Sequence, residues 1–462
     1  MQIPILAGAY TDSDSNYRVS YPVNLFPIPQ SQGISDGYMR PADGIVSFAT
    51  GQGNDRGAIN WNDEVYRASG TKLIKVASNG AVTVLGDIGG TDQVSFTYSF
   101  DRLAVASNGN LYYYDPVGGF VQVTDPDLGT VIDVVWVDGY FMTTDGEFLV
   151  VTELSDPTQV NPLKYGSSEA DPDPVVSLVK VRNEIYAINR YTSEVFDNVG
   201  GELFPFQRIE GGQIMRGCVG THAAIEFLGG IVMLGGGRNE PVSLWLCSNA
   251  NAEKLSSREV DLILQGYTEE QLSTVVIEKR IDGSFKQVYI HLPDKTLVYD
   301  FAASQAVQRP AWTILKNGNT YDARNMVWCY NKWIVGDPFS SRIGYYDSSI
   351  GSHYGDAVEW EVQTKILYNN ANGAVIHRLE IVGITGNNTG PNNTIYTSYS
   401  TDGVNWSAEK SISAGVAGDY AKRLVWFKQG ILRNYRIQKI RGSSDAMLSI
   451  AALDATIEPL VF

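Results

Sequence analysis

A unit of several short strands separated by turns recurs along this chain about every 35–45 residues. The first unit spans residues 56–88 and reads RGAINWN, EVYRASGT, KLIKVAS and AVTVLGDI. The second spans residues 94–127 and reads VSFTYSF, RLAVASN, NLYYYDP and FVQVTDP. Each segment alternates apolar with polar residues or forms a short apolar run, and Gly, Asn and Asp lie between segments as hairpin turns require. This pattern predicts one four-stranded blade of a β-propeller per unit.

Further units follow, and their order predicts seven blades, with six as the nearest alternative. The third and fourth units begin at Val131 and Val175. The last three contain AAIEFLGGIVMLGGG with VSLWLCSN, KQVYIHLP with KTLVYDFA, and MVWCYNKWIVGDP with RIGYYDSS and VEWEVQTKI. A large β-sandwich also has strands at short spacing, but seven units are too many for one sandwich. We therefore predict an all-β fold with a β-propeller over residues 36–367.

A short helical insertion near residues 251–272 interrupts the strand pattern between the fifth and sixth units. Its apolar face is formed by Val260, Leu262, Ile263 and Leu264. Gly266 can end this helix, and Thr268 with Gln271 fits a capping box that starts a second one. We expect the insertion either to pack on the rim of the propeller or to serve as a docking element.

The two ends of the chain differ from the repeat. Residues 368–462 hold Asn- and Gly-rich stretches between strands such as VIHRLEIVGI and AMLSIAALDATI, which predicts a separate C-terminal β-sandwich. Residues 1–35 show little periodicity and contain three separated prolines, which favours an extended N-terminal arm. These prolines are Pro22, Pro27 and Pro29.

The charge of the chain constrains its partners. With 35 basic and 51 acidic residues the net charge is −16, whereas proteins that grip nucleic acid usually present a basic surface. No apolar run approaches the roughly 20 residues that cross a bilayer, so we expect no membrane insertion. The first ten residues also lack the pattern of a secretory signal.

Cysteine and histidine are sparse and isolated. The three cysteines, an odd number, are far apart and read as buried reduced thiols of a protein folded in the cytoplasm. They are Cys218, Cys247 and Cys329, and the four histidines are His222, His291, His353 and His377. Because a metal site would need paired ligands, we predict no metal and no cofactor.

Two segments superficially resemble sites of enzymes. Ser400–Trp406 reads STDGVNW, which resembles the Asp-box turns of sialidase propellers but has one residue fewer between Asp and Trp. We interpret it as a structural hairpin, with sugar contact as the alternative. Gly235–Gly237 follows a strand but precedes a proline-bearing segment that cannot open a phosphate-binding helix. No nucleophile elbow, zinc-binding HExxH or P-loop occurs, and we predict no catalytic residues.

One segment is basic in this otherwise acidic chain. No acidic residue lies among its seven cations, which are Lys422, Arg423, Lys428, Arg433, Arg436, Lys439 and Arg441. Side chains alternate along a strand, so Arg433 and Lys439 would share a face and Arg436 would lie opposite if the strand is unbroken. Three interpretations stay open: a solvated strand face, a surface that docks an acidic neighbour, and direct phosphate binding.

Several segments, in the same order and over most of the chain, resemble the packaged-DNA stabilisation proteins of short-tailed bacteriophages, also called tail hub or head-completion proteins. They include YPVNLFPIPQ, GYMRPADGI, QGYTEEQLS, VYIHLPDKTLVYDFAASQAVQRPAWTILK and KRLVWFKQGILRNYRIQKIRG. The resemblance implies a virion tail subunit, made in the host cytoplasm, that closes the DNA channel below the portal and its adaptor ring. It also implies a homo-hexameric ring, a tail needle as plug and tailspikes nearby.

A physical hypothesis follows from this implied role. A ring of such acidic subunits repels phosphate, so DNA would pass through the channel without specific binding. The alternative function is a carbohydrate-active propeller, a glycosidase or glycan-binding protein with a sugar-binding sandwich, which would need two carboxylates across a cleft.

Overall fold

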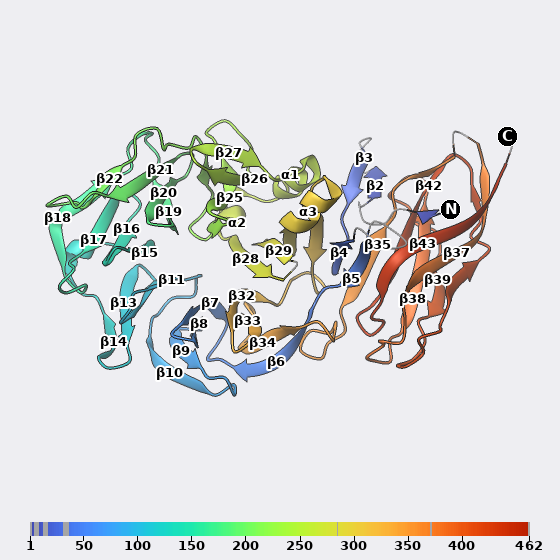
Figure 1. The fold of residues 1–462 in the computed structure, drawn as a ribbon, viewed down its shortest axis with the longest axis horizontal. Coiled ribbons are helices and arrows are strands. Elements are labelled where there is room, and N and C mark those ends of the chain that lie inside the picture. The colour runs from blue at the N-terminus through green and yellow to red at the C-terminus, as the bar shows by residue number, and fades with distance from the viewer. Residues whose placement is uncertain are drawn as a thin grey trace.

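A computed structural model describes residues 2–3, 9–12, 17–30, 37–283, 285–369 and 372–460. It consists of a ring of sheets around an axis and a β-sandwich beside it (Figure 1). Both chain ends lie on the side of the sandwich. The predicted fold class, a β-propeller followed by a β-sandwich, is confirmed.

The first four blades each contain four consecutive antiparallel strands. Blade one has β7 (Asp55–Trp61), β8 (Glu64–Ser69), β9 (Lys72–Val76) and β10 (Val82–Asp87). Blade two has β11 (Ser95–Tyr98), β12 (Leu103–Ser107), β13 (Asn110–Asp115) and β14 (Gly119–Gln122), followed by the short helix η1 (Pro126–Leu128). Blade three has β15 (Asp133–Val137), β16 (Tyr140–Thr144), β17 (Phe148–Thr152) and β18 (Val160–Ser167). Blade four has β19 (Val175–Val181), β20 (Glu184–Asn189), β21 (Ser193–Asn198) and β22 (Phe206–Arg208).

Three more sheets complete the ring in the described part of the chain. Blade five has β23 (Gly217–Cys218), β24 (Ala224–Phe227), β25 (Gly230–Gly236), β26 (Ser243–Ser248) and β27 (Asn251–Lys254). Blade six has β28 (Val276–Asp282), β29 (Phe285–His291), β30 (Thr296–Asp300) and β31 (Trp312–Leu315). Blade seven has β32 (Arg324–Cys329), β33 (Lys332–Gly336), β34 (Arg342–Asp347) and β6 (Gly44–Thr50).

Tight turns join the innermost strand of several blades to the next strand. In blade one both turn residues, Asn62 and Asp63, have φ near +55° (53° and 59°), and in blade three Asp138 and Gly139 have φ of 48° and 94°. Two-residue turns with positive φ match the right-handed twist of the strands they join. Each of these turns follows the end of an inner strand and reverses the chain into the second strand of the same blade.

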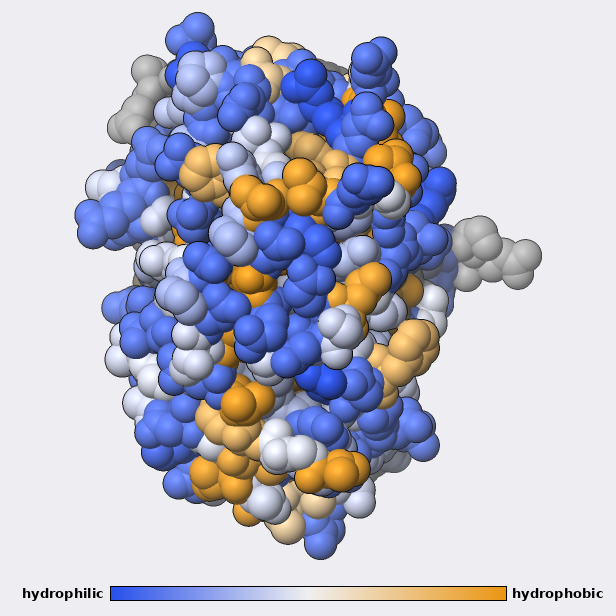
Figure 2. Space-filling model, turned by 90° about the vertical axis from the view of Figure 1, so that its left-hand side faces the viewer, coloured by the Kyte–Doolittle hydropathy of each residue, from blue (hydrophilic) through white to orange (hydrophobic). Residues whose placement is uncertain are grey.

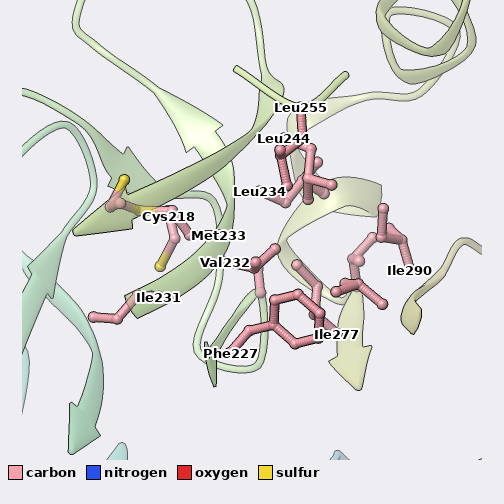
Figure 3. Close-up of a cluster of buried hydrophobic side chains, with 14 of the residues drawn as sticks. Cys218, Phe227, Ile231, Val232, Met233, Leu234, Leu244, Leu255, Ile277 and Ile290 are labelled. Carbon is pink, nitrogen blue, oxygen red and sulfur yellow. The ribbon is translucent and has the colours of Figure 1, made fainter. Parts of the chain in front are cut away.

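The hydrophobic core is divided among the interfaces between neighbouring blades. The largest described cluster lies between blades four, five and six and includes Phe227, Met233 and Ile290 (Figure 3). Two predicted helices cover it: α1 (Arg258–Leu264) buries Val260 and Leu264, and α2 (Glu269–Ser273) begins with the capping box of Thr268 and Gln271. The start of the predicted insertion is instead strand β27, and a further helix, α3 (Phe301–Val307), lies between β30 and β31.

The seventh blade is closed by a strand from near the N-terminus. The prediction that VEWEVQTKI belongs to this blade is wrong, because β35 (Glu359–Gln363) pairs with β42 of the sandwich. The outer strand is β6, which pairs with β34 from Gly44 opposite Asp347 to Thr50 opposite Arg342. Strand pairing therefore changes from propeller to sandwich between β34 and β35, ahead of the predicted boundary at 367.

The sandwich contains two sheets in the described residues. One has β4 (Leu25–Pro29), β5 (Gly37–Pro41), β43 (Ser449–Pro459), β37 (Ala374–Ile384) and β40 (Leu424–Phe427), with β1 (Gln2–Ile3) and β41 (Ile431–Leu432) attached. The other has β35, β42 (Tyr435–Ser443), β38 (Thr394–Ser400) and β39 (Lys410–Ser413), with β36 (Leu367–Tyr368) attached. A separate hairpin joins β2 (Ala9–Asp12) to β3 (Tyr17–Ser20).

The segment predicted as an extended arm takes part in the sandwich and links it to the propeller. Residues 1, 4–8, 13–16 and 31–35 of this segment lie outside the described residues. The Asn24 amide nitrogen donates to the carbonyl of Lys316 in the propeller and to that of Glu359 at the start of β35, both at 2.7 Å. The backbone of Val23 also pairs with Glu361 in both directions, at 2.8 and 3.0 Å. Asn24 therefore binds both parts at once.

A buried polar network joins the first blade to the last. The Arg67 guanidinium donates to the Asp55 carboxylate at 2.6 Å and to the backbone carbonyl of Asn325 in blade seven at 3.0 Å. The Asn325 amide donates to the other Asp55 oxygen at 2.7 Å. Arg67 is fully buried and Asp55 is 5% exposed, so each charge depends on the other for its stabilisation.

Replacing Arg67 by Met should lower the free energy of unfolding by about 3–5 kcal/mol, since it leaves the Asp55 carboxylate buried without a cation. The double change Arg67→Met with Asp55→Asn should recover much of this loss. Lys72→Met, which removes the exposed pair of Lys72 with Asp87, should change the free energy of unfolding little. Denaturant unfolding followed by tryptophan fluorescence measures all three, and equal costs for Arg67→Met and Lys72→Met would contradict the role assigned to the network.

Candidate functional site

The innermost strands of the propeller surround a cavity of about 770 Å³ on the axis. Each blade contributes one strand to its wall, and in chain order these are β7, β11, β15, β19, β24, β28 and β32. Figure 1 looks down this axis, so most of these strands are seen around the centre of the ring. Concave sites with a few convergent polar groups are the default candidates for ligand binding.

Polar side chains lie along one part of the cavity wall, at the beginnings of the inner strands. Glu278 accepts hydrogen bonds from the backbone nitrogen of Met326 at 2.9 Å and shares one with the His291 ring at 2.7 Å. Asp133 accepts from the backbone nitrogen of Leu178 at 2.8 Å. Burial raises the pKa of Asp133 to about 6. Both carboxylates thus already have donors from their own chain.

His222 also lines this wall. Burial lowers the pKa of its imidazole to about 4, so the neutral ring is favoured in the folded chain. The cavity therefore holds a neutral histidine beside carboxylates that accept hydrogen bonds from their own chain. Among the described residues no group of three or more His, Cys, Asp and Glu side chains is placed to hold a metal ion.

The opposite end of the axis has a different character, because exposed aromatic side chains of blades two, three and seven lie on part of its rim. Tyr98 and Trp328 are each about half exposed, at 47% and 48%, and Phe100 is 90% exposed. Trp136 contacts Phe100 edge to face, with ring centres 5.6 Å apart. Exposed apolar side chains of this kind are candidates for contact with a partner.

The seven predicted docking cations do not form one surface. The prediction is wrong for Arg436, which is fully buried inside the sandwich. Its guanidinium donates to Gln438 at 2.7 Å and to the carbonyl of Gln429 at 2.6 Å, and it lies 4.0 Å from the ring centre of Tyr399. Burial lowers the pKa of Arg436 to about 10. This residue stabilises the interior and cannot dock a partner.

Lys439 and Arg441 lie on the other face of β42, as alternation requires, while Arg433 precedes the strand. Arg441 forms a bidentate pair with Glu409, with both distances 2.7 Å. The Lys439 ammonium lies 4.2 Å from the ring centre of Trp406. These two cations therefore already have partners within the chain.

Arg423 is exposed but pairs with Glu380 at 2.8 Å. Within the part of the chain that the structure describes, the remaining predicted cations form no ion pair, and all three are exposed: Lys422, Lys428 and Arg433. The segment thus presents a small basic surface, and only these three positions are free to meet an acidic neighbour.

The other singled-out residues have structural roles. In the STDGVNW hairpin one Asp402 oxygen accepts from the backbone nitrogens of Val404 and Asn405 at 2.9 and 2.7 Å, and Ser400 bridges to Trp406. A hydrogen bond from the Asn405 side-chain amide to the other Asp402 oxygen at 2.7 Å, together with these backbone bonds, holds the pKa of Asp402 well below its usual range. The three cysteines are buried and unpaired, and burial raises the pKa of Cys218 to about 12.

None of the helices in the described ranges has the length and hydropathy that crossing a bilayer needs. The fold is thus a propeller joined to a sandwich, with hydrogen-bonded carboxylates in the axial cavity and an aromatic rim at one end of the axis. Two family models of bacteriophage proteins match the chain. The model described as "Bacteriophage P22 Gp10, beta-propeller" matches residues 1–351, and the model described as "Bacteriophage P22 Gp10, beta-sandwich" matches residues 359–458. The chain belongs to the Gp10 family of phage P22.

A relative of known name agrees with this assignment. The tail hub protein gp10 of Salmonella phage P22 is 26% identical over 486 aligned positions, which cover 99% of each chain. Among solved structures, the Pan2 WD40 domain of Neurospora crassa covers 65% of this chain and 95% of its own, with 10% identity and a TM-score of 0.44. PorZ of Porphyromonas gingivalis has 12% identity and a TM-score of 0.40, and the match covers 79% of this chain and 46% of PorZ.

The low pKa of His222 has a consequence for stability. Above pH 6.5 the ring is neutral in both the folded and the unfolded chain, so its titration costs no stability. As pH falls from 6.5 towards the folded pKa of about 4, the unfolded chain takes up a proton that the folded chain does not, and the folded state loses stability. His222→Gln should therefore reduce the loss of stability between pH 6.5 and 4, by on the order of 2 kcal/mol. Denaturant midpoints across this pH range measure the effect. The control His377→Gln removes an imidazole that is 52% exposed, and equal effects of both changes would contradict the assignment.

Proposed function

We propose that this chain is a structural subunit of a phage tail, a tail hub that works without catalysis. The observation that carries the proposal is the match to the P22 tail hub protein over 99% of both chains, which includes propeller and sandwich together. We place the protein in the virion tail for the same reason. Six copies form a ring below the portal-adaptor ring, with the needle and the tailspikes as neighbours.

The charge of the chain supports a passive role towards DNA. Each subunit carries a net charge of −16, so a ring multiplies the negative charge around its channel. Acidic walls repel phosphate, which keeps packaged DNA mobile. Retention of the genome then comes from a closed channel and a plug.

The satisfied carboxylates favour this role over the alternative of a glycosidase. A retaining or inverting enzyme needs two carboxyl groups about 5–9 Å apart across a cleft, free to donate and accept protons. In the axial cavity, Asp133 and Glu278 accept hydrogen bonds from their own chain. Hydrolysis of bacterial polysaccharide by the purified chain would overturn the non-catalytic assignment.

Electron microscopy of the purified protein, alone and mixed with portal-adaptor rings of the same phage, tests the structural proposal. We expect the chain to add to the adaptor ring as a closed ring of copies. Failure to associate with the adaptor at any mixing ratio would contradict the structural proposal.

Filter binding with duplex DNA at low salt should show only weak affinity, and tight binding that falls steeply with salt would contradict the acidic-channel mechanism.

The exposed cations of the basic segment make a separate prediction. Lys422→Glu with Arg433→Glu should weaken association with an acidic neighbour, mainly through a slower association rate and a loss of salt dependence. The matched control is Arg258→Glu with Lys286→Glu, which makes the same charge change on exposed positions of the propeller part. If both double variants assemble with equal rates, the segment is a solvated strand face.

A further inference from the structure

Charge is unevenly distributed along the chain. Between Arg102 and Lys164 the sequence contains nine acidic residues and no Lys, Arg or His. This stretch forms strands β12 to β17 of blades two and three, which lie on the left of Figure 1, away from the sandwich. Figure 2 faces that side of the molecule, where small apolar groups stand out on a largely hydrophilic surface. This side of the propeller is thus acidic, with apolar groups exposed among the charges.

A hollow of about 240 Å³ lies on this side, between η1 and the strands β17 and β18. Asp127 and Asp145 line it beside Phe148 and Tyr165, whose rings pack edge to face with their centres 5.1 Å apart. Tyr165 is 51% exposed, and Leu163 on the same strand is 61% exposed. We call this site the rim hollow. It is open to a side chain from outside and offers that side chain both an apolar wall and carboxylates.

The carboxylates of the rim hollow lack cations of their own. Asp145 accepts from the backbone nitrogens of Glu147 and Phe148 at 2.9 and 2.8 Å, but neither Asp145 nor Asp127 forms an ion pair among the described residues. The cation on the wall, Lys164, is occupied by Glu153 at 2.8 Å. A basic side chain from a partner would therefore meet two carboxylates and an aromatic ring, both of which attract cations.

The sandwich presents the opposite charge on a similar apolar background. Residues 410–444 contain eight Lys and Arg residues and one acidic residue. Within this range a turn after β40 exposes Lys428 between Phe427 and Ile431, which are 66% and 51% exposed. The Lys428 backbone has φ of 53°, and its nitrogen donates to the carbonyl of His377 at 2.7 Å, so the turn is held in place. We call residues 427–431 the basic turn.

Positive charge predominates around the basic turn. The Lys410 ammonium donates to the carbonyl of Lys428, and in the described part of the chain neither lysine forms an ion pair. Glu458 on β43 is occupied by a hydrogen bond from or to the ring of His377, at 2.8 Å. The acidic residue of the range, Asp419, precedes β40, whereas the basic turn follows it. The basic turn therefore carries charge complementary to that of the rim hollow.

The two surfaces belong to one chain but cannot meet within it, because blades two and three lie at one end of the molecule and the sandwich at the other (Figure 1). We propose that the basic turn of one copy docks into the rim hollow of the next copy. Lys428 then meets Asp127 and Asp145, and Phe427 packs against Tyr165. A contact between two different surfaces is head-to-tail, and it closes into a ring when the rotation between copies permits. This inference rests on the proposed function, since it states how neighbouring copies in the ring make contact.

Charge reversal tests the contact. Lys428→Glu and Asp127→Lys, made in separate full-length chains, should each weaken self-association about ten-fold or more, because like charges then face each other. An equal mixture of the two variants should restore it, since the reversed turn of one then meets the reversed hollow of the other. Sedimentation velocity over a concentration series measures the association in solution, and electron microscopy measures it on adaptor rings.

Matched controls separate the contact from general effects of charge. Glu253→Lys makes the same reversal at an exposed position on β27, the outer strand of blade five. Lys286→Glu reverses an exposed cation on β29 of blade six. Both should associate as the wild type does. Circular dichroism and thermal midpoints should match the wild type for all four variants, since the changed side chains are at the surface.

Several outcomes would overturn the inference. These are a wild type that stays monomeric both in solution and on adaptor rings, reversals without effect, and a mixture that associates as weakly as the single variants. Loss of binding to the adaptor or the needle in Lys428→Glu, with association between copies intact, would show that another protein takes the basic turn. Closed rings on the adaptor that neither reversal disturbs would contradict this contact and leave the proposed function standing. Self-association that both reversals abolish, without any binding to the adaptor, would support the contact and contradict the proposed function.

Discussion

A propeller exists only if its last sheet meets its first, and here backbone hydrogen bonds between β6 and β34 make that junction. Without β6 the seventh blade would present an unpaired edge, which is a site for pairing with other chains. The buried network of Asp55, Arg67 and Asn325 lies at the same junction. The axial cavity depends on this closure, because each blade supplies one strand of its wall. The aromatic rim depends on it as well.

Sequence reasoning recovered what is local and missed what is distant. Blades one to four were readable because their strands are consecutive and joined by turns such as Asp138-Gly139. The capping box at Thr268 was visible for the same reason. The partner of β6 lies some 300 residues away (44–50 against 342–347), and the alternating pattern of a strand does not specify which strand it pairs with. Alternation correctly predicted that Arg436 and Lys439 lie on opposite faces of the strand. It did not predict the burial of Arg436, which depends on contacts with Gln438, Gln429 and Tyr399.

Polar and apolar groups are divided between the interior and the surface in a way that fits an assembly protein. Inside the propeller, carboxylates such as Glu278 are occupied by donors from their own chain. Outside, the chain carries a net charge of −16 and exposes aromatic side chains at one end of the propeller axis and three unpaired cations on the sandwich. Asn24 joins propeller and sandwich through hydrogen bonds to both, so a load on one part is transmitted to the other.

The use of early strands to finish late sheets has a consequence for synthesis. A ribosome adds about 5–20 residues per second, so β6 remains without its partner for tens of seconds until β34 has been synthesised. The edge of β5 that pairs with β43 stays free for longer, since the paired residue Ile450 is synthesised later than β34. During this interval both strands expose backbone groups that could pair with other nascent chains. A polypeptide that ends before β34 therefore cannot close its propeller, and one that ends before Ile450 leaves β5 without this partner.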